Sequence, residues 1–219
     1  MIIESVQKVV IWIVPVIFAI TIHEAAHGWV ASKFGDQTAR LLGRITLNPI
    51  KHVDPFGTIV IPITLLLISG FVFGWAKPVP VDWRNLHNPK RDMAFVAAAG
   101  PISNLLMAFF WALLAKIAYA VTQDPSSILV LMGGAGITIN LILAILNIIP
   151  IPPLDGSRVM SSLLPARAAY QYNLITPYGF LIIVGLLATG ILSKIMMPPF
   201  IVLLHFIADL FALPMQMFY

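Results

Sequence analysis

The residues best suited to chemistry are two histidines and a glutamate inside an apolar run. The stretch FAITIHEAAHGWVA (residues 18–31) contains His23, Glu24 and His27. Burying three such groups in hydrocarbon is costly, so ionisable residues in a membrane segment are functional by default. Residues four apart on a helix point the same way, one turn apart, so His23 and His27 can bind one Zn²⁺ ion through their imidazoles. Glu24 can then reach a metal-bound water as general base.

Two histidines alone do not complete a catalytic zinc site, which usually has three protein ligands and one open position. The sequence has no cysteine, so the third ligand must be His, Asp or Glu. Most such residues outside the motif lie in basic loops, where a solvated role is expected. Asp155 differs, because it lies in NIIPIPPLDG (147–156), where prolines end a helix and Gly156 permits a tight turn. We therefore predict Asp155 as the third metal ligand.

Amide side chains precede Asp155 and also lie in the middle of the chain. Asn147 is eight residues before Asp155. Its NH₂ group either stabilises a developing oxyanion and orients substrate, or bonds a neighbouring helix. We expect Asn140 only to pack. In AAAGPISN (97–104), small residues let helices approach closely, and Asn104 suits either a packing site next to the metal or a purely structural role.

The composition indicates a membrane protein. Of 219 residues, 59% are hydrophobic and 10% charged, against about 25% charged in a soluble domain. Lys8 and the run after it resemble a signal peptide, but the run continues into the histidine motif, so we expect a retained helix. We predict an all-α polytopic membrane protein, a single domain over residues 1–219, with about five to six transmembrane helices. The apolar segments are 9–31, 56–74, 92–120, 128–149, 176–192 and 198–218.

The charged loops predict how the chain crosses the bilayer. Lysine and arginine occur in residues 32–55, 75–91 and 150–175, whereas residues 121–127 contain neither. The positive-inside rule places the basic loops in the cytoplasm, so the net charge of +4 reports orientation and does not indicate a nucleic-acid partner. Because basic loops flank both ends of 56–74, we predict a re-entrant segment there, with a tilted span as the alternative.

The re-entrant topology also serves the metal site. With it, the crossings at 92–120 and 128–149 return the chain to the side of the histidines at Asp155. With a full crossing at 56–74, Asp155 would lie roughly 30 Å away, on the opposite face. We further expect short extended, β-like elements near the first helix, in GRITLNPI (43–50) and AKPVPVDW (76–83). The second segment suits either an edge strand or a polyproline conformation.

Three motifs in order, HEAAH, AGPISNLL (99–106) and NIIPIPPLDG, resemble the site-2 protease family of intramembrane zinc metalloproteases, in its compact prokaryotic form without PDZ or CBS domains. The resemblance covers residues 9 to about 160, the expected catalytic core. It implies one Zn²⁺ per chain, held by His23, His27 and Asp155, with Glu24 as catalytic base and Asn147 linked to transition-state stabilisation. No function is carried onto the helices in 176–218.

The resemblance implies hydrolysis of peptide bonds in the transmembrane segments of membrane proteins. The expected location is the cell membrane, in a multi-pass arrangement with the active site towards the cytoplasm. A membrane metal-ion transporter or metal-binding protein remains the alternative, although a transporter gains nothing from a general base beside His23. A catalytically silent scaffold would have no need of costly polar groups in lipid.

Overall fold

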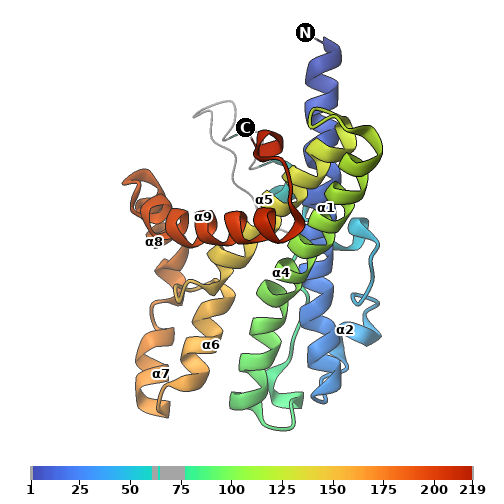
Figure 1. Cartoon of the computed structure of the whole chain (residues 1–219). Helices are drawn as coiled ribbons and strands as arrows, with labels where there is room; N and C mark the ends of the chain where they lie inside the picture. Colours follow the sequence, from blue (N-terminus) through green and yellow to red (C-terminus); the bar gives the residue numbers. More distant parts are fainter. Residues whose placement is uncertain (1, 61–63, 65–76, 219) are drawn as a thin grey trace.

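The chain folds into a bundle of helices. The computed structural model describes residues 2–60, 64 and 77–218, and these residues form helices and turns but no strand (Figure 1). This confirms the predicted all-α polytopic membrane protein. Within the described ranges, five segments are long and apolar enough to cross a membrane: Gln7–Lys33, Pro89–Thr122, Ile128–Ile148, Ala166–Ala188 and Ile191–Phe211. The α-helices in this part of the chain are α1 (Ile2–Lys33), α2 (Thr38–Leu41), α4 (Pro89–Thr122), α5 (Ile128–Ile148), α6 (Asp155–Leu163), α7 (Ala166–Asn173), α8 (Gly179–Ala188) and α9 (Ile191–Phe211).

Helices α1, α4 and α5 form the centre of the molecule, and each packs against the other two. Small residues allow this close contact. A Cβ atom added at Gly133 of α5 would lie 2.5 Å from the Cβ of Ala115 on α4, and Gly136 packs directly on the ring of Trp111. Lipid tails are as apolar as the side chains, so close packing of small residues, rather than burial from water, holds such helices together.

The end of α1 and the beginning of α4 lie side by side at the same end of the bundle (Figure 1). The backbone N–H of His87 donates to the carbonyl of Phe34 at 2.9 Å. The chain therefore makes no net crossing between these residues, as the topological argument for Asp155 requires. The predicted re-entrant segment 56–74 falls largely on residues 61–63 and 65–76, which lie outside the described residues; its first part forms the π-helical turn Pro55–Val60.

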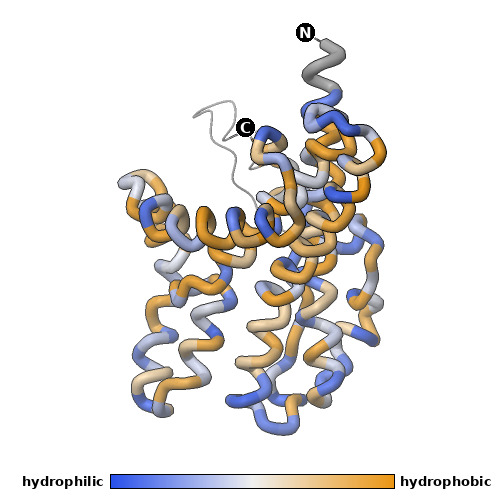
Figure 2. Tube along the Cα trace, viewed as in Figure 1, coloured by the Kyte–Doolittle hydropathy of each residue, from blue (hydrophilic) through white to orange (hydrophobic). Residues whose placement is uncertain are grey.

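Figure 2 shows hydrophilic residues gathered where α1 ends and α4 begins, and towards the tip of the α6–α7 pair. These regions coincide with the basic loops of the sequence. Helices α6 and α7 extend from the lower end of α5, and α9 runs across α4 and α5 rather than along them (Figure 1). We name the end of the bundle that carries these basic loops the polar end, and the catalytic candidates on α1 and α6 lie towards it.

The segments predicted to be β-like do not pair as strands. Residues 43–50 form bends that lead into the 3₁₀ turn Pro49–His52, and residues 77–82 are non-helical. The edge-strand alternative is therefore not observed, because Pro78 and Pro80 remove two N–H donors that a β-ladder would need; the polyproline alternative for residues 76–83 stays a prediction.

The boundary between the last two helices also differs from the prediction, which placed it between residues 192 and 198. The chain turns at Gly190, which has a φ of +72°, and α9 continues through Pro198 and Pro199. Glycine adopts positive φ without a steric cost, whereas membrane helices tolerate proline. Glycine therefore sets this boundary, and the proline pair does not.

A buried carboxylate fastens the end of α1 to the segment before α4. Asp36 has no exposed surface and accepts hydrogen bonds from the backbone N–H groups of Thr38 (3.0 Å) and Asp82 (2.8 Å) and from the amide of Asn85 (3.1 Å). Burial alone would raise the pKa of this carboxyl, but the hydrogen bonds outweigh burial and lower the pKa. The ionised side chain therefore holds residues 82–85 beside α1.

Replacing Asp36 by asparagine should destabilise this junction. The amide NH₂ would face an N–H donor, so we expect Asp36→Asn to lose about 2 kcal/mol of unfolding free energy at pH 7, measured by denaturant titration in detergent. Since the folded pKa is lowered, the contribution of Asp36 is present above the ordinary pKa of aspartate and is lost as pH falls through the folded value. The exposed Asp124→Asn is the control. A variant as stable as wild type at pH 7 would contradict the assignment.

Candidate metal centre and active site

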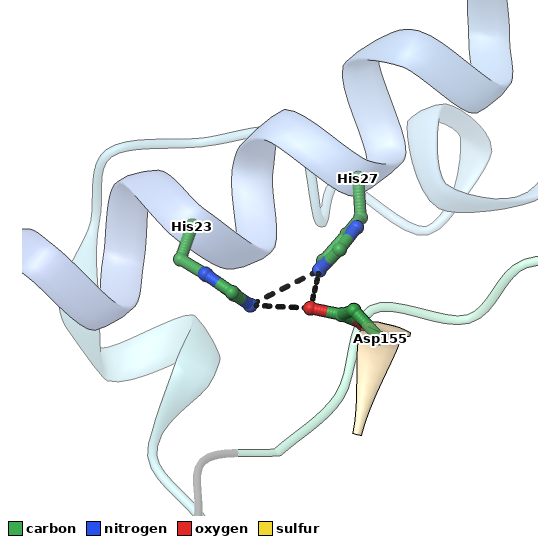
Figure 3. A group of neighbouring side chains, drawn as sticks. All are labelled: His23, His27 and Asp155. Atoms are coloured by element: carbon green, nitrogen blue, oxygen red, sulfur yellow. Dashed lines mark hydrogen bonds and ion pairs between the residues drawn. The ribbon is translucent and has the colours of Figure 1, made fainter. Parts of the chain in front are cut away.

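The two histidines of the HEAAH motif lie on one face of α1, within the membrane-crossing part of that helix. Their Nε2 atoms are 3.1 Å apart, and both rings point away from the helix towards the same point (Figure 3). His27 lies six residues and His23 ten residues before the end of α1 at Lys33, which corresponds to about 9–15 Å along the helix at ~1.5 Å per residue. The pair therefore lies within the bilayer, nearer the polar end.

Asp155 is the first residue of α6 and completes a triangle with the histidines (Figure 3). Its Oδ2 atom is 3.1 Å from Nε2 of His23 and 3.2 Å from Nε2 of His27. Gly156 makes this position possible, because its Cα packs directly against the carbonyl of Ile148 and leaves no room for a side chain. The tight turn after α5 thus returns the carboxylate to the histidines.

The Nδ1 atom of each imidazole is hydrogen-bonded to a carbonyl oxygen. Nδ1 of His23 lies 2.6 Å from Oδ1 of Asn104, and Nδ1 of His27 lies 2.7 Å from the carbonyl oxygen of Val96. A carbonyl oxygen can only accept, so each Nδ1 carries a proton, and in the neutral imidazole Nε2 then presents a lone pair. This is the tautomer that a metal-binding histidine needs, with its other nitrogen held by a carbonyl group.

The three inward atoms fit a tetrahedral cation. Two imidazole lone pairs and a carboxylate oxygen would repel one another at 3.1–3.2 Å unless a positive charge lay between them. Ligands about 2.0–2.1 Å from a tetrahedral zinc ion are separated by about 3.3 Å, close to the observed spacing. Oδ2 of Asp155 is also buried without a hydrogen-bond donor. Among the described residues, this is the one group of three His, Asp or Glu side chains close enough to share a metal.

Burial opposes ionisation of the Asp155 carboxyl, whereas a cation held between the three side chains would favour the anion, which is the form that binds a metal.

Gly100 of α4 supplies the open side of the centre. A Cβ atom added there would lie 2.5 Å from Nε2 of His27 and 2.6 Å from Nε2 of His23. The glycine therefore leaves a space against both ligand nitrogens that any larger residue would fill. The sequence predicts close helix packing for the small residues of AAAGPISN, and the fold places one of them, Gly100, beside the histidines.

A chain of buried amides supports His23. Besides accepting from His23, Asn104 donates from its NH₂ to the carbonyl of Ala19 (3.3 Å) and to Oδ1 of Asn140 (2.9 Å), and Asn140 donates to the carbonyl of Gly136 (2.9 Å). Neither asparagine has exposed surface. The expectation that Asn140 only packs missed this link between α1, α4 and α5, although two asparagines in apolar helices were the signal.

Glu24 lies beside the centre and is held by the non-helical segment 77–82. Its Oε2 atom accepts a hydrogen bond from the backbone N–H of Val79 at 2.8 Å. The neighbours of Val79 are both proline, so Val79 supplies the N–H in this stretch that can reach Glu24. Arg44 fixes the same segment by donating to the carbonyl of Lys77 at 2.9 Å. One carboxylate oxygen of Glu24 is thus held by a hydrogen bond, while the other is able to accept and release a proton.

Asn147 occupies a different position from the three ligand candidates. Its NH₂ group donates to the carbonyl of Leu143, one turn earlier on α5, at 3.1 Å. Its side chain lines a cavity between α4 and α6. Asn147 therefore lies at the wall of this cavity and does not hydrogen-bond the imidazoles.

Substituting Gly100 tests whether the space beside the histidines holds a metal. We expect Gly100→Ala to lose most of its bound zinc, because the added methyl group would lie against both ligand nitrogens. Zinc per chain is measured by elemental analysis of the purified protein. Gly185→Ala is the matched control, because nothing lies within 4 Å of a Cβ at Gly185 of α8. Equal zinc content in both variants would contradict the placement.

Removing the amide of Asn104 should weaken the metal centre without removing a ligand. Asn104→Ala leaves the Nδ1 proton of His23 without its acceptor, so we expect zinc affinity to fall by roughly 10–100-fold. Affinity is measured by competition with a chelator of known strength. Asn173→Ala, in the exposed part of α7, should bind zinc like wild type. An unchanged affinity in Asn104→Ala would show that the contact does not support the ligand.

Comparisons with known proteins agree with this geometry. The sequence pattern of Peptidase family M50 matches residues 11–128 and 116–186. The chain is 40% identical over 190 residues to "Putative zinc metalloprotease YwhC" of Bacillus subtilis, covering 85% of this chain and 84% of that protein. It is 29% identical over 180 residues to "Putative zinc metalloprotease Rip2" of Mycolicibacterium smegmatis, covering 81% and 66%. No solved structure matches the chain. The chain is a multi-pass membrane protein, and it belongs to peptidase family M50.

Proposed function

We propose that the protein is an intramembrane zinc metalloprotease that hydrolyses peptide bonds in the transmembrane segments of membrane proteins. In this proposal His23, His27 and Asp155 hold one zinc ion and Glu24 is the general base. The observation that carries it is the approach of three electron-pair donors, from α1 and α6, to within 3.1–3.2 Å of one another. The family membership and the names of the relatives support the same chemistry.

Zinc in such a site acts as a Lewis acid and lowers the pKa of a coordinated water to about 7. Side chains of the protein transfer the proton of the attacking water. Glu24, anchored through Oε2 by the N–H of Val79, takes the proton from the attacking water and later delivers it to the nitrogen of the leaving amine. Asn147 donates from its NH₂ group to the carbonyl oxygen that gains negative charge.

The depth of the site supports a substrate that lies in the membrane. His23 and His27 are inside a membrane-crossing segment, so the scissile bond must reach the same depth. A helical substrate hides its carbonyl groups in hydrogen bonds and must unwind locally before hydrolysis. We place the protein in the cell membrane with the active site towards the cytoplasm, because the basic loops lie at the polar end of the bundle.

We also propose that residues 1–219 form one domain, with a catalytic core of about 9–160 and helices in 176–218 that carry no catalytic residue. The alternative of a metal-ion transporter gains no support from the family or from the relatives.

The substitution Glu24→Gln separates proton transfer from metal binding. We expect cleavage of a model single-span substrate to fall by at least about 10²-fold, while zinc content stays near that of wild type, because Glu24 is not a ligand in the proposed site. Cleavage is followed by electrophoresis and mass spectrometry with protein in detergent or liposomes. The exposed carboxylate variant Asp124→Asn should cleave normally. Equal cleavage by Glu24→Gln and wild type would remove Glu24 as the base, and metal transport into liposomes by both would favour a transporter.

A further inference from the structure

A cavity of about 410 Å³ lies between α4 and α6, next to the candidate metal centre. Its α4 wall consists of Ala97, Ala98, Pro101, Ile102 and Leu105. Its α6 wall consists of Gly156, Val159, Met160 and Leu163. Both sets have the spacing of a single helix face, so the cavity is the space between two facing apolar stripes.

The cavity exists because small residues oppose one another where the two helices meet. Ala97 and Ala98 have no side chain long enough to fill the gap. Protein interiors are otherwise close-packed, with few voids larger than a water molecule. The volume lies within the range of about 300–1,000 Å³ that is typical of ligand pockets. An apolar group of appreciable size is therefore its expected occupant.

The walls of this cavity are continuous with the candidate metal centre. Pro101 directly follows Gly100, which faces both histidines. On the other wall, Gly156 directly follows Asp155. Asn147, the proposed oxyanion donor, lines the same cavity. A group that fills it would thus lie beside the atoms proposed to perform hydrolysis.

The outer rim of the cavity faces the lipid side of the bundle. Three large apolar residues of the lining are exposed: Ile102 (53%), Ile148 (57%) and Leu163 (74%). Helices α4 and α5 both cross the membrane, so exposed apolar side chains on them contact lipid. An occupant can therefore enter sideways from the bilayer, without passing through water.

The lining defines the chemistry of the occupant. It contains no charged residue, and Asn147 is its one polar side chain. A charged group would lose its hydration there without finding a partner, which is strongly unfavourable. An apolar side chain loses nothing, and Asn147 can bond the polar backbone that carries it.

We propose that this cavity is a specificity pocket that receives a large apolar side chain, such as leucine, methionine or phenylalanine, next to the scissile bond of the substrate. The assignment rests on the peptidase function proposed above. Continuity with the metal centre and the amide of Asn147 favour a peptide over a lipid chain as the occupant.

A substrate series tests the pocket directly. After the cleaved bond of a model single-span substrate is mapped by mass spectrometry, each flanking residue is changed in turn to Leu, Phe, Ala or Lys. At one of these positions we expect kcat/KM for Leu or Phe to exceed that for Ala by about 10-fold or more, with Lys not cleaved. Ala98→Met, which fills the cavity, should abolish the preference while zinc content is unchanged. Ala120→Met, at the exposed far end of α4, should retain it.

Cross-linking tests occupancy independently of turnover. The chain has no cysteine, so Met160→Cys places a single thiol in the cavity wall. In the Glu24→Gln background, a substrate with one cysteine next to the scissile bond should form a disulfide with this thiol when oxidised by diamide. The same substrate should not cross-link to Ala120→Cys.

The outcomes separate the pocket from the peptidase. A lost preference in Ala98→Met together with a specific cross-link at position 160 supports the pocket. Two results would each overturn the pocket: wild type that cleaves the Leu and Ala substrates at equal rates, or no cross-link at position 160. Either result would assign the cavity to lipid chains and would leave the proposed peptidase function intact. Zinc-loaded wild type that cleaves no substrate overturns the peptidase function, and the pocket with it.

Discussion

Mutual repulsion among three electron-pair donors is the constraint on which the structure depends. Nε2 of His23, Nε2 of His27 and Oδ2 of Asp155 approach to 3.1–3.2 Å, and each of these side chains is at most 13% exposed. A cation bound between the three atoms would relieve this repulsion. The surrounding structure is arranged to hold this geometry: carbonyl oxygens orient the imidazoles, Gly100 keeps the space open, and a glycine turn brings back the carboxylate.

The parts of the site that sequence predicts are those governed by local periodicity or by the number of membrane crossings. The spacing of His23 and His27 fixes them on one helix face, whatever the rest of the chain does. The position of Asp155 followed from charge in the loops, since an even number of crossings must separate the carboxylate from the end of α1. Side-chain types and hydropathy were sufficient for both inferences.

The remaining contacts depend on how the helices pack, which no short window of sequence specifies. Asn104 reaches His23, and Gly100 faces the histidines, only because α4 lies against α1. Asn104 reaches Asn140 only because α4 and α5 pack closely. Likewise, the turn at Gly190 was missed because proline is a weaker helix terminator in a membrane than in water. These features come from packing between residues distant in sequence.

The short helix α6 joins the two halves of the proposed chemistry. Its first residue, Asp155, is the third ligand candidate, and the face that begins at Gly156 lines the cavity beside α4. Any shift of α6 that widens the cavity for a substrate side chain must also move the Asp155 carboxylate relative to the histidines of α1. Metal geometry and substrate fit are therefore coupled through one rigid element. The ligand candidates on α1 have no such link, since α1 packs against α4 and α5 rather than against the cavity.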